Sequence, residues 1–273
     1  MSRLIKIGVF DSGVGGLTVL KQLVAHIPEA EYLYFGDTAR LPYGSKSAET
    51  VARFTIEAAR FLESRGIDML VIGCNTASAL ALPAIRDAVK VPVEGVVEPG
   101  AAAAANASRR KNVVVIATEA TIRSHAYLNA LEKRGINARE KACPLFVPLI
   151  EEGWIDHPVT ERVAHEYLDQ FFHDYESGPD ALVLGCTHYP LIKPILRSVA
   201  PWRVEIVDSA ESTARVVAAE LGKSTTSDAG SAGSSNHTAI TYFATDSVDR
   251  FKRVGQLFMG TALDKVEHVK IEG

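Results

Sequence analysis

The sequence predicts an α/β fold of two similar domains that face each other, each with a parallel sheet and helices on both of its faces. Short apolar, β-branched runs alternate with helical patterns almost from end to end of the 273 residues, an order typical of parallel sheets covered by helices. Each half also contains an apolar run that ends in Gly-Cys, at Cys74 and at Cys186. These matched turns indicate that the halves are built alike and that one site lies between two thiols.

The predicted strands are continuous apolar runs rather than alternating ones, as expected for strands buried on both faces. They cover residues 4–10, 32–35, 69–73, 93–96, 113–117, 181–185, 204–207 and 238–243. The segments between them predict helices over residues 16–26, 48–65, 77–89, 121–133, 159–172, 213–221 and 248–258. Ser47 is a suitable N-cap for the second of these helices, whose first turn contains Glu49. Segment 223–237 is rich in Ser and Gly and predicts a flexible surface loop.

The composition is that of a globular protein without an obvious macromolecular partner. Hydrophobic residues make up 47% of the chain, and the formal net charge of −4 offers no basic surface for nucleic acid. No window reaches the roughly 18 apolar residues that a membrane span needs, and the N-terminus lacks the apolar region of a signal peptide. Three cysteines without local pairing fit a reducing compartment. We therefore expect a soluble cytoplasmic protein.

The two Gly-Cys turns are the main candidates for chemistry. Ligands of α/β sheets bind beyond the carboxyl ends of the strands, and Cys74 and Cys186 both fall at that edge, where a helix also begins. Backbone N–H groups and the helix dipole stabilise a thiolate there. Buried structural cysteines are the alternative, and this is the interpretation for Cys143. A zinc site is disfavoured because further ligands at the usual spacing are missing, so no metal is predicted.

Other polar residues are predicted at the same edge of the sheets. The turn from Asp11 to Gly16 could hold an anion on backbone amides, but it lacks the third glycine of a dinucleotide fingerprint. Asp11 is therefore expected to accept from an ammonium group or to position a proton. His188 could titrate with Cys186. Segments 40–45 and 148–153 are predicted as turns, and Thr118 and Thr121 could bind a carboxylate or cap the next helix.

Four separated motifs together resemble the glutamate racemases of the cofactor-independent aspartate/glutamate racemase superfamily. They are Phe10-Asp11-Ser12-Gly13-Val14-Gly15-Gly16-Leu17, Gly36-Asp37-Thr38 with Pro42-Tyr43-Gly44, Gly73-Cys74-Asn75-Thr76-Ala77-Ser78, and Gly185-Cys186-Thr187-His188-Tyr189-Pro190-Leu191. The match extends from residue 7 to about residue 208, and the C-terminal region fits in length and pattern only. The Ser/Gly-rich segment 223–237 is not part of the family pattern.

The resemblance implies that the chain interconverts L- and D-glutamate and supplies D-glutamate for peptidoglycan, without a pyridoxal or other cofactor. Cys74 would deprotonate D-glutamate with help from Asp11. Cys186 would deprotonate L-glutamate with help from His188 and Glu151, which we favour over Glu152. Asp11 and His188 would also contact the substrate, together with Ser12, Pro42, Tyr43, Gly44, Ser45, Asn75, Thr76, Thr118, Thr121 and Thr187.

The resemblance also implies that residues 98–207 form a second domain inserted in a first domain of residues 1–97 and 208–273, with the active site in the cleft between them. A homodimer is the default expectation for a soluble oligomer.

Three other functions compete with this one. A racemase of the same superfamily could act on aspartate, a hydantoin or a malonate. A cytoplasmic amino-acid-binding protein would also have two α/β lobes around a cleft. A thiol redox protein is disfavoured because the two cysteines are 112 positions apart (186 − 74) and no Cys-x-x-Cys is present.

Overall fold

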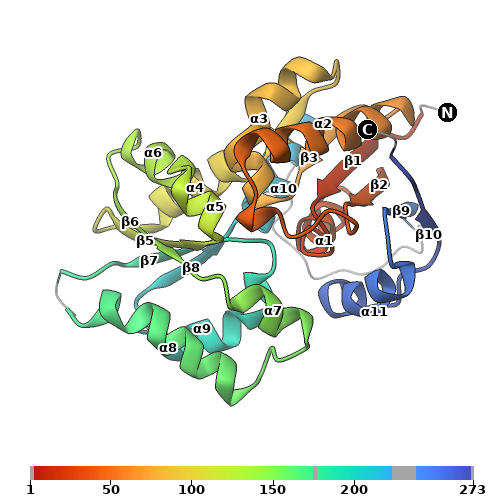
Figure 1. Cartoon of the computed structure of the whole chain (residues 1–273). Coiled ribbons are helices and arrows are strands. Elements are labelled where there is room, and N and C mark those ends of the chain that lie inside the picture. The colour runs from red at the N-terminus through yellow and green to blue at the C-terminus, as the bar shows by residue number, and fades with distance from the viewer. Residues whose placement is uncertain (1–2, 175–176, 223–237, 272–273) are drawn as a thin grey trace.

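The computed structural model describes residues 3–174, 177–222 and 238–271, and shows two parallel sheets with helices on both faces of each (Figure 1). This confirms the predicted fold class. The predicted loop 223–237 lies outside the described residues. None of the helices within the described ranges is long and apolar enough to cross a membrane.

The first sheet has six parallel strands in the order β10-β9-β2-β1-β3-β4. These strands are β1 Lys6–Asp11, β2 Glu31–Gly36, β3 Met69–Ile72, β4 Val93–Gly95, β9 Ile240–Ala244 and β10 Val266–His268. One face packs against α1 Leu17–His26 and α11 Val248–Met259, and the other face against α2 Ala48–Ser64 and α3 Asn75–Ala88. Neighbouring residues of β1 therefore enter different cores, which explains its continuous apolar run.

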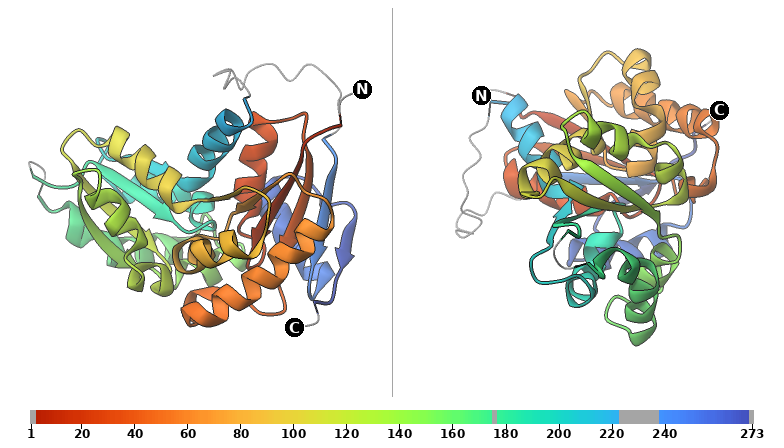
Figure 2. Two further views of the ribbon diagram at one scale, coloured as in Figure 1. Left: turned by 90° about the horizontal axis from the view of Figure 1, so that it is seen from above. Right: turned by 90° about the vertical axis from the view of Figure 1, so that its left-hand side faces the viewer.

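The second sheet has four parallel strands in the order β6-β5-β7-β8. They are β5 Asn112–Ala117, β6 Asn137–Ala142, β7 Ala181–Gly185 and β8 Glu205–Asp208. Helices α4 Val97–Ala107 and α6 Ala126–Glu132 cover one face, whereas α7 Phe146–Glu151, α8 Pro158–Phe172 and α9 Lys193–Val199 cover the other. Helix α10 Ser209–Glu220 packs against both α1 and α4 and so joins the two halves. Figure 2 shows the two sheets with their helices as lobes side by side.

Two local predictions are wrong. The expected helix over residues 121–133 is two helices, α5 Glu119–Arg123 and α6, because His125 has a left-handed backbone with φ of 53°. The expected turn over residues 148–153 is largely the helix α7, which is followed by Gly153 at φ of +80°. By contrast, Ser47 caps α2 as predicted, because its side chain accepts a hydrogen bond from the backbone N–H of Thr50.

The sequence analysis missed helices α4 and α9 and two edge strands, and the strands have local reasons. Strand β6 is the edge of its sheet and half-exposed, so its sequence is polar rather than an apolar run. Strand β10 is a three-residue edge strand. The proposed domain boundaries near residues 97 and 207 stay a prediction, although β1 to β4 and β9 to β10 belong to one sheet and β5 to β8 to the other.

Candidate active site

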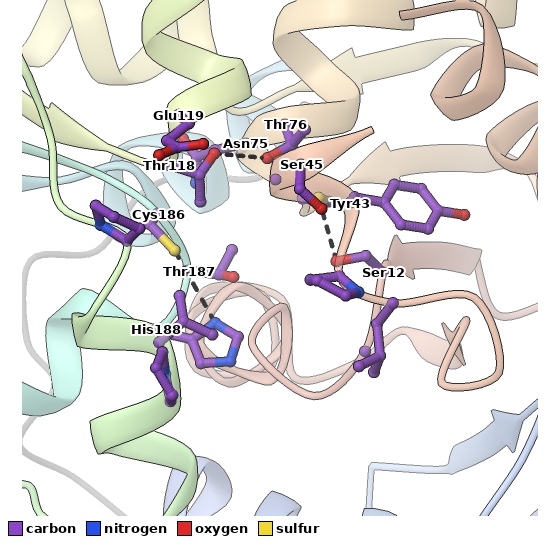
Figure 3. A pocket seen from close by; sticks show the side chains of 18 of the residues that line it. Ser12, Tyr43, Ser45, Asn75, Thr76, Thr118, Glu119, Cys186, Thr187 and His188 are labelled. Carbon is purple, nitrogen blue, oxygen red and sulfur yellow. Dashed lines mark hydrogen bonds between the residues drawn. The ribbon is translucent and has the colours of Figure 1, made fainter. Parts of the chain in front are cut away.

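A cavity of about 380 Å³ opens between the two halves at the carboxyl ends of their strands. Both cysteines line it, and both are free, buried thiols with 5% of their surface exposed. Figure 3 shows Cys186 and His188 on one side of the pocket and Ser12 and Ser45 on the other. The cavity lies where ligands of open α/β sheets bind, and it presents two thiols from opposite lobes to one space.

Cys74 lies between β3 and the first turn of α3 and serves as the N-cap residue of that helix. Its thiol donates to Ser12 Oγ at 3.6 Å. Burial and the nearby charge of Asp11 raise the pKa of Cys74 to about 12, although contacts with Ala77 and Ser12 oppose the shift. Cys74 is therefore a neutral thiol near pH 7, and it can donate a proton to a carbon placed in the cavity.

Cys186 follows β7, and its polar partners differ from those of Cys74. Its Sγ lies 4.0 Å from Nδ1 of His188, whose Nε2 lies 3.0 Å from Oε1 of Glu151. Burial lowers the pKa of His188, but the contacts with Cys186 and Glu151 outweigh it and raise that pKa to about 10. Protonated His188 therefore places a positive charge beside the sulfur on this side of the cavity.

Asp11 ends β1 and is buried. Its Oδ2 accepts from the backbone N–H of Gly13 at 2.9 Å. Burial raises the pKa of Asp11, while the nearby His188 opposes the shift. Because its charge acts on both Cys74 and His188, the carboxyl group can influence both cysteines and their partners, although it is not among the lining residues.

In the glycine-rich turn after β1, Gly15 faces the opposite lobe. A Cβ atom on Gly15 would overlap Thr187 Oγ1 and lie 2.5 Å from Nδ1 of His188. The Oγ1 of Thr18 also donates to the backbone carbonyl of Thr187 at 3.0 Å. The turn therefore lets the two lobes approach closely beside Cys186.

Three threonines join the lobes above the cavity. Thr76 Oγ1 on α3 lies 3.0 Å from Thr118 Oγ1 (Figure 3). Thr121 Oγ1 lies 3.3 Å from Thr76 Oγ1 and 2.9 Å from Thr118 Oγ1. Thr118 also caps α5 by accepting from the N–H of Thr121, which confirms its expected capping role, whereas its binding of a carboxylate stays a prediction. Beside this cluster, Asn75 accepts a hydrogen bond from the hydroxyl of Tyr127 at 2.7 Å.

The loop from Leu41 to Ser45 lines one wall of the cavity. The buried carboxylate of Asp37 fixes the position of this loop. Asp37, at the end of β2, accepts from the hydroxyl of Tyr43 at 2.5 Å and from Nε of Arg40 at 2.7 Å. Thr245, after β9, donates to its other oxygen at 3.0 Å. Asp37 therefore fixes the loop.

The structure brings most of the predicted residues to one cavity. Its lining includes the two cysteines, Glu151, and the predicted residues Ser12, Pro42, Tyr43, Gly44, Ser45, Asn75, Thr76, Thr118, Thr187 and His188. Asp11 and Thr121 lie behind this lining, in contact with its members. Gly13, Leu41 and Pro148 also line the cavity and belong to turns predicted at this edge, although they were not named as site residues. Sequence reasoning missed Glu119, Pro144 and Val147. Among the described residues, no three His, Cys, Asp or Glu side chains gather as a metal site.

Replacing Glu151 with glutamine is expected to lower the pKa of His188 from about 10 toward its ordinary value of roughly 6.5, because the neighbouring negative charge is lost. A histidine with a raised pKa stabilises the fold fully below about pH 6.5 and loses that contribution as pH rises through the folded-state pKa. In Glu151→Gln the stabilising contribution of His188 is therefore lost at a lower pH than in the wild type. NMR titration of the imidazole measures the shift.

The matched control is Glu152→Gln, because Glu152 is the exposed neighbour of Glu151. It is expected to leave the titration of His188 unchanged. Equal shifts in the two variants would contradict the assignment of Glu151 as the partner of His188.

Replacing Asp11 with asparagine is expected to lower the pKa of Cys74 from about 12, because burial still raises it but the repulsion by Asp11 is lost. The pH dependence of alkylation at Cys74, resolved by peptide mass spectrometry, measures this. An unchanged or higher pKa would show that the charge of Asp11 does not act on Cys74.

The chain is similar to a known protein family over most of its length. The family model for Asp/Glu/hydantoin racemases matches residues 7–217. The chain is 56% identical to the glutamate racemase of Koribacter versatilis, with 98% of each chain covered. It is similar to the crystal structure of glutamate racemase from Francisella tularensis in complex with D-glutamate (TM-score 0.86, 36% identity, 98% of each chain covered).

It is also similar to the structure of Escherichia coli glutamate racemase in complex with L-glutamate and activator UDP-MurNAc-ala (TM-score 0.78, 28% identity, 99% of this chain and 100% of that chain covered). A family match over most of the chain, relatives of high identity and a shared fold lead to the same conclusion: the chain belongs to the Asp/Glu/hydantoin racemase family.

Proposed function

We propose that this racemase interconverts L- and D-glutamate by two-base proton transfer between Cys74 and Cys186. The observation that carries the proposal is that two buried thiols from opposite lobes line one cavity, each with its own polar partners. The α-proton of an amino acid is weakly acidic, so its removal needs a close base shielded from water. Inversion also needs an acid on the other face of the carbon, and two thiols meet both needs.

In the direction from L- to D-glutamate, the Cys186 thiolate takes the α-proton and becomes a thiol. The Cys74 thiol gives its proton to the opposite face of the carbanion and becomes a thiolate. The unequal partners fit these starting states, because protonated His188 lies beside Cys186 whereas burial and Asp11 keep Cys74 neutral. The conversion of D- to L-glutamate starts with Cys74 as the thiolate and Cys186 as the thiol, which is the state in which the forward conversion ends.

The hydroxyl groups around the cavity are suited to the polar groups of the substrate. Ser12, Thr76, Thr118 and Thr187 line the wall and can donate to carboxylate oxygens. Asn75 and the loop 42–45 complete the wall above Cys74. Asp11 lies behind the wall, where it assists Cys74.

The relatives support glutamate as the substrate. The relative from Koribacter versatilis is named a glutamate racemase, and the two similar crystal structures contain D- and L-glutamate. Circular dichroism of the purified chain with L-glutamate and with L-aspartate tests this directly. We expect the circular dichroism signal to decay with L-glutamate and to persist with L-aspartate. Racemisation of L-aspartate in preference would instead support the aspartate alternative, and binding without racemisation would support an amino-acid-binding protein.

D-Glutamate made by this reaction would supply peptidoglycan synthesis, a role favoured by the similar Escherichia coli structure, which holds the cell-wall precursor UDP-MurNAc-ala as its activator. Depletion of the gene product in its host is expected to cause a requirement for D-glutamate and a loss of cell shape. The homodimer expected from the sequence is part of the same proposal, and sedimentation of the purified chain measures it.

A further inference from the structure

Helix α11 from the first lobe contacts the acid–base pair of the second lobe at two points. Nη2 of Arg250 lies 3.0 Å from Oε2 of Glu151. Two turns later on the same helix, the ring of Phe258 packs edge-on against His188, with ring centroids 5.2 Å apart and planes at 84°. The four side chains form one continuous chain from Arg250 through Glu151 and His188 to Cys186.

The two oxygens of Glu151 have different partners, and this fixes the carboxylate. Oε1 accepts from His188 and Oε2 from Arg250, each at 3.0 Å. Without Arg250 the carboxylate could rotate about its terminal bond, and the imidazole would lose its fixed acceptor. The side chain of Glu151 is 15% exposed and that of Arg250 is 54% exposed. Arg250 is therefore the member of this series of contacts that lies nearest to solvent.

The charges that face this pair come from several elements. Asp11 at the end of β1 acts on both His188 and Glu151, and Cys186 faces His188 from the end of β7. Asp246 shares a second cavity of about 100 Å³ with Glu151 and Arg250, next to the substrate cavity. Burial raises the pKa of Glu151, but His188 and Arg250 outweigh it and lower that pKa. Arg250 is the cation that α11 supplies to this cluster.

We propose that Arg250 is a positioning residue: it fixes the orientation of the Glu151 carboxylate, which in turn holds the imidazole of His188 next to the sulfur of Cys186. This inference rests on the proposed function and adds that the C-terminal helix of one lobe sets the Cys186 half of the reaction, while the Cys74 half does not depend on it. The contacts given above connect Arg250 to Cys186 through two side chains, whereas Cys74 is served by Ser12 and Asp11.

The asymmetry has a kinetic signature. The equilibrium constant of a racemase is 1, so kcat/KM changes equally in both directions and cannot separate the two halves. Primary deuterium isotope effects can separate the Cys186 step from the Cys74 step. If the Cys186 step slows, the primary effect with [2-²H]-L-glutamate rises because that step takes the deuteron. The effect with [2-²H]-D-glutamate falls, because Cys74 takes that deuteron in a step that limits the rate less.

The test compares Arg250→Met, Arg250→Lys and the control Arg253→Met, which changes an exposed arginine on the same helix. We expect Arg250→Met to lower kcat/KM roughly 10-fold, less than the ~10²-fold cost of a 1 Å misplacement because Arg250 is half-exposed. Its isotope effects should move in opposite directions for the two enantiomers. Arg250→Lys is expected to restore most of the rate, and Arg253→Met to match the wild type.

Wild-type kinetics in Arg250→Met would overturn the proposal. A slower Arg250→Met with both isotope effects unchanged would also overturn it, since the loss would then be a general structural one. The proposed function itself is tested by the wild-type arm of the same assay. A wild-type chain that does not racemise glutamate would refute that function, and the role of Arg250 in it would fall for that separate reason.

Discussion

Replacement of either Cys74 or Cys186 by alanine is expected to reduce glutamate racemisation by about 10⁴-fold, the upper end of what one positioned acid or base contributes. Each variant keeps one thiol, but inversion needs a proton removed from one face and delivered to the other. Both cysteines line the cavity and also pack against the two hydrophobic cores. Circular dichroism of L-glutamate measures the rate.

Cys143→Ala is the matched control. Cys143 is a fully buried thiol packed in the core beyond β6, and it is not among the residues that line the cavity. Its loss is expected to lower thermal stability and leave kcat/KM near the wild-type value. Near-normal turnover in either Cys74→Ala or Cys186→Ala would refute the two-thiol mechanism.

Gly15→Ala is expected to lower activity by about 10²-fold through geometry alone. The added methyl group would overlap Thr187 Oγ1 and lie 2.5 Å from Nδ1 of His188. Backbone and imidazole must therefore shift beside Cys186, and a displacement of about 1 Å at a catalytic group costs on that order. Steady-state kinetics with a thermal melt of the same sample measure the loss.

Gly135→Ala separates this effect from lost stability. Gly135 has φ of +71° and no atom within 4 Å of an added methyl group, so alanine there costs about 1–2 kcal/mol of stability by backbone strain. Activity is expected to stay unchanged. A Gly15→Ala variant with wild-type kinetics would show that the close approach of the two lobes does not position His188.

The residues at the ends of the strands could be predicted from the sequence because two local signals coincide there. An apolar run places a strand, and the glycine after it places a turn at the carboxyl edge, as at Gly73-Cys74 and Gly185-Cys186. The polar residues that follow each turn then fall at the mouth of the sheet. Both cysteines and His188 were found in this way, and the structure brings them to one cavity.

Residues outside that pattern could not be placed. Strand β6 is half-exposed and polar, so nothing in its sequence predicted the wall formed after it by Pro144 and Val147. The segment 148–153 contains Pro148 and Gly153 and looked like a turn, although Pro148 is tolerated in the first turn of α7. The ion pair between Glu151 and Arg250 joins residues 99 positions apart, a contact that only the tertiary structure reveals.

The most direct test of the two-base mechanism is the fate of the α-hydrogen when wild-type protein converts L-glutamate in D2O at low conversion. The two thiols act on opposite faces, so the proton taken by Cys186 is not the one that Cys74 delivers. We expect every new D-glutamate molecule to contain deuterium at Cα, while the remaining L-glutamate keeps protium. D-Glutamate that retains the α-protium of the substrate would show that a single base serves both faces, and would contradict the assignment of Cys74 and Cys186.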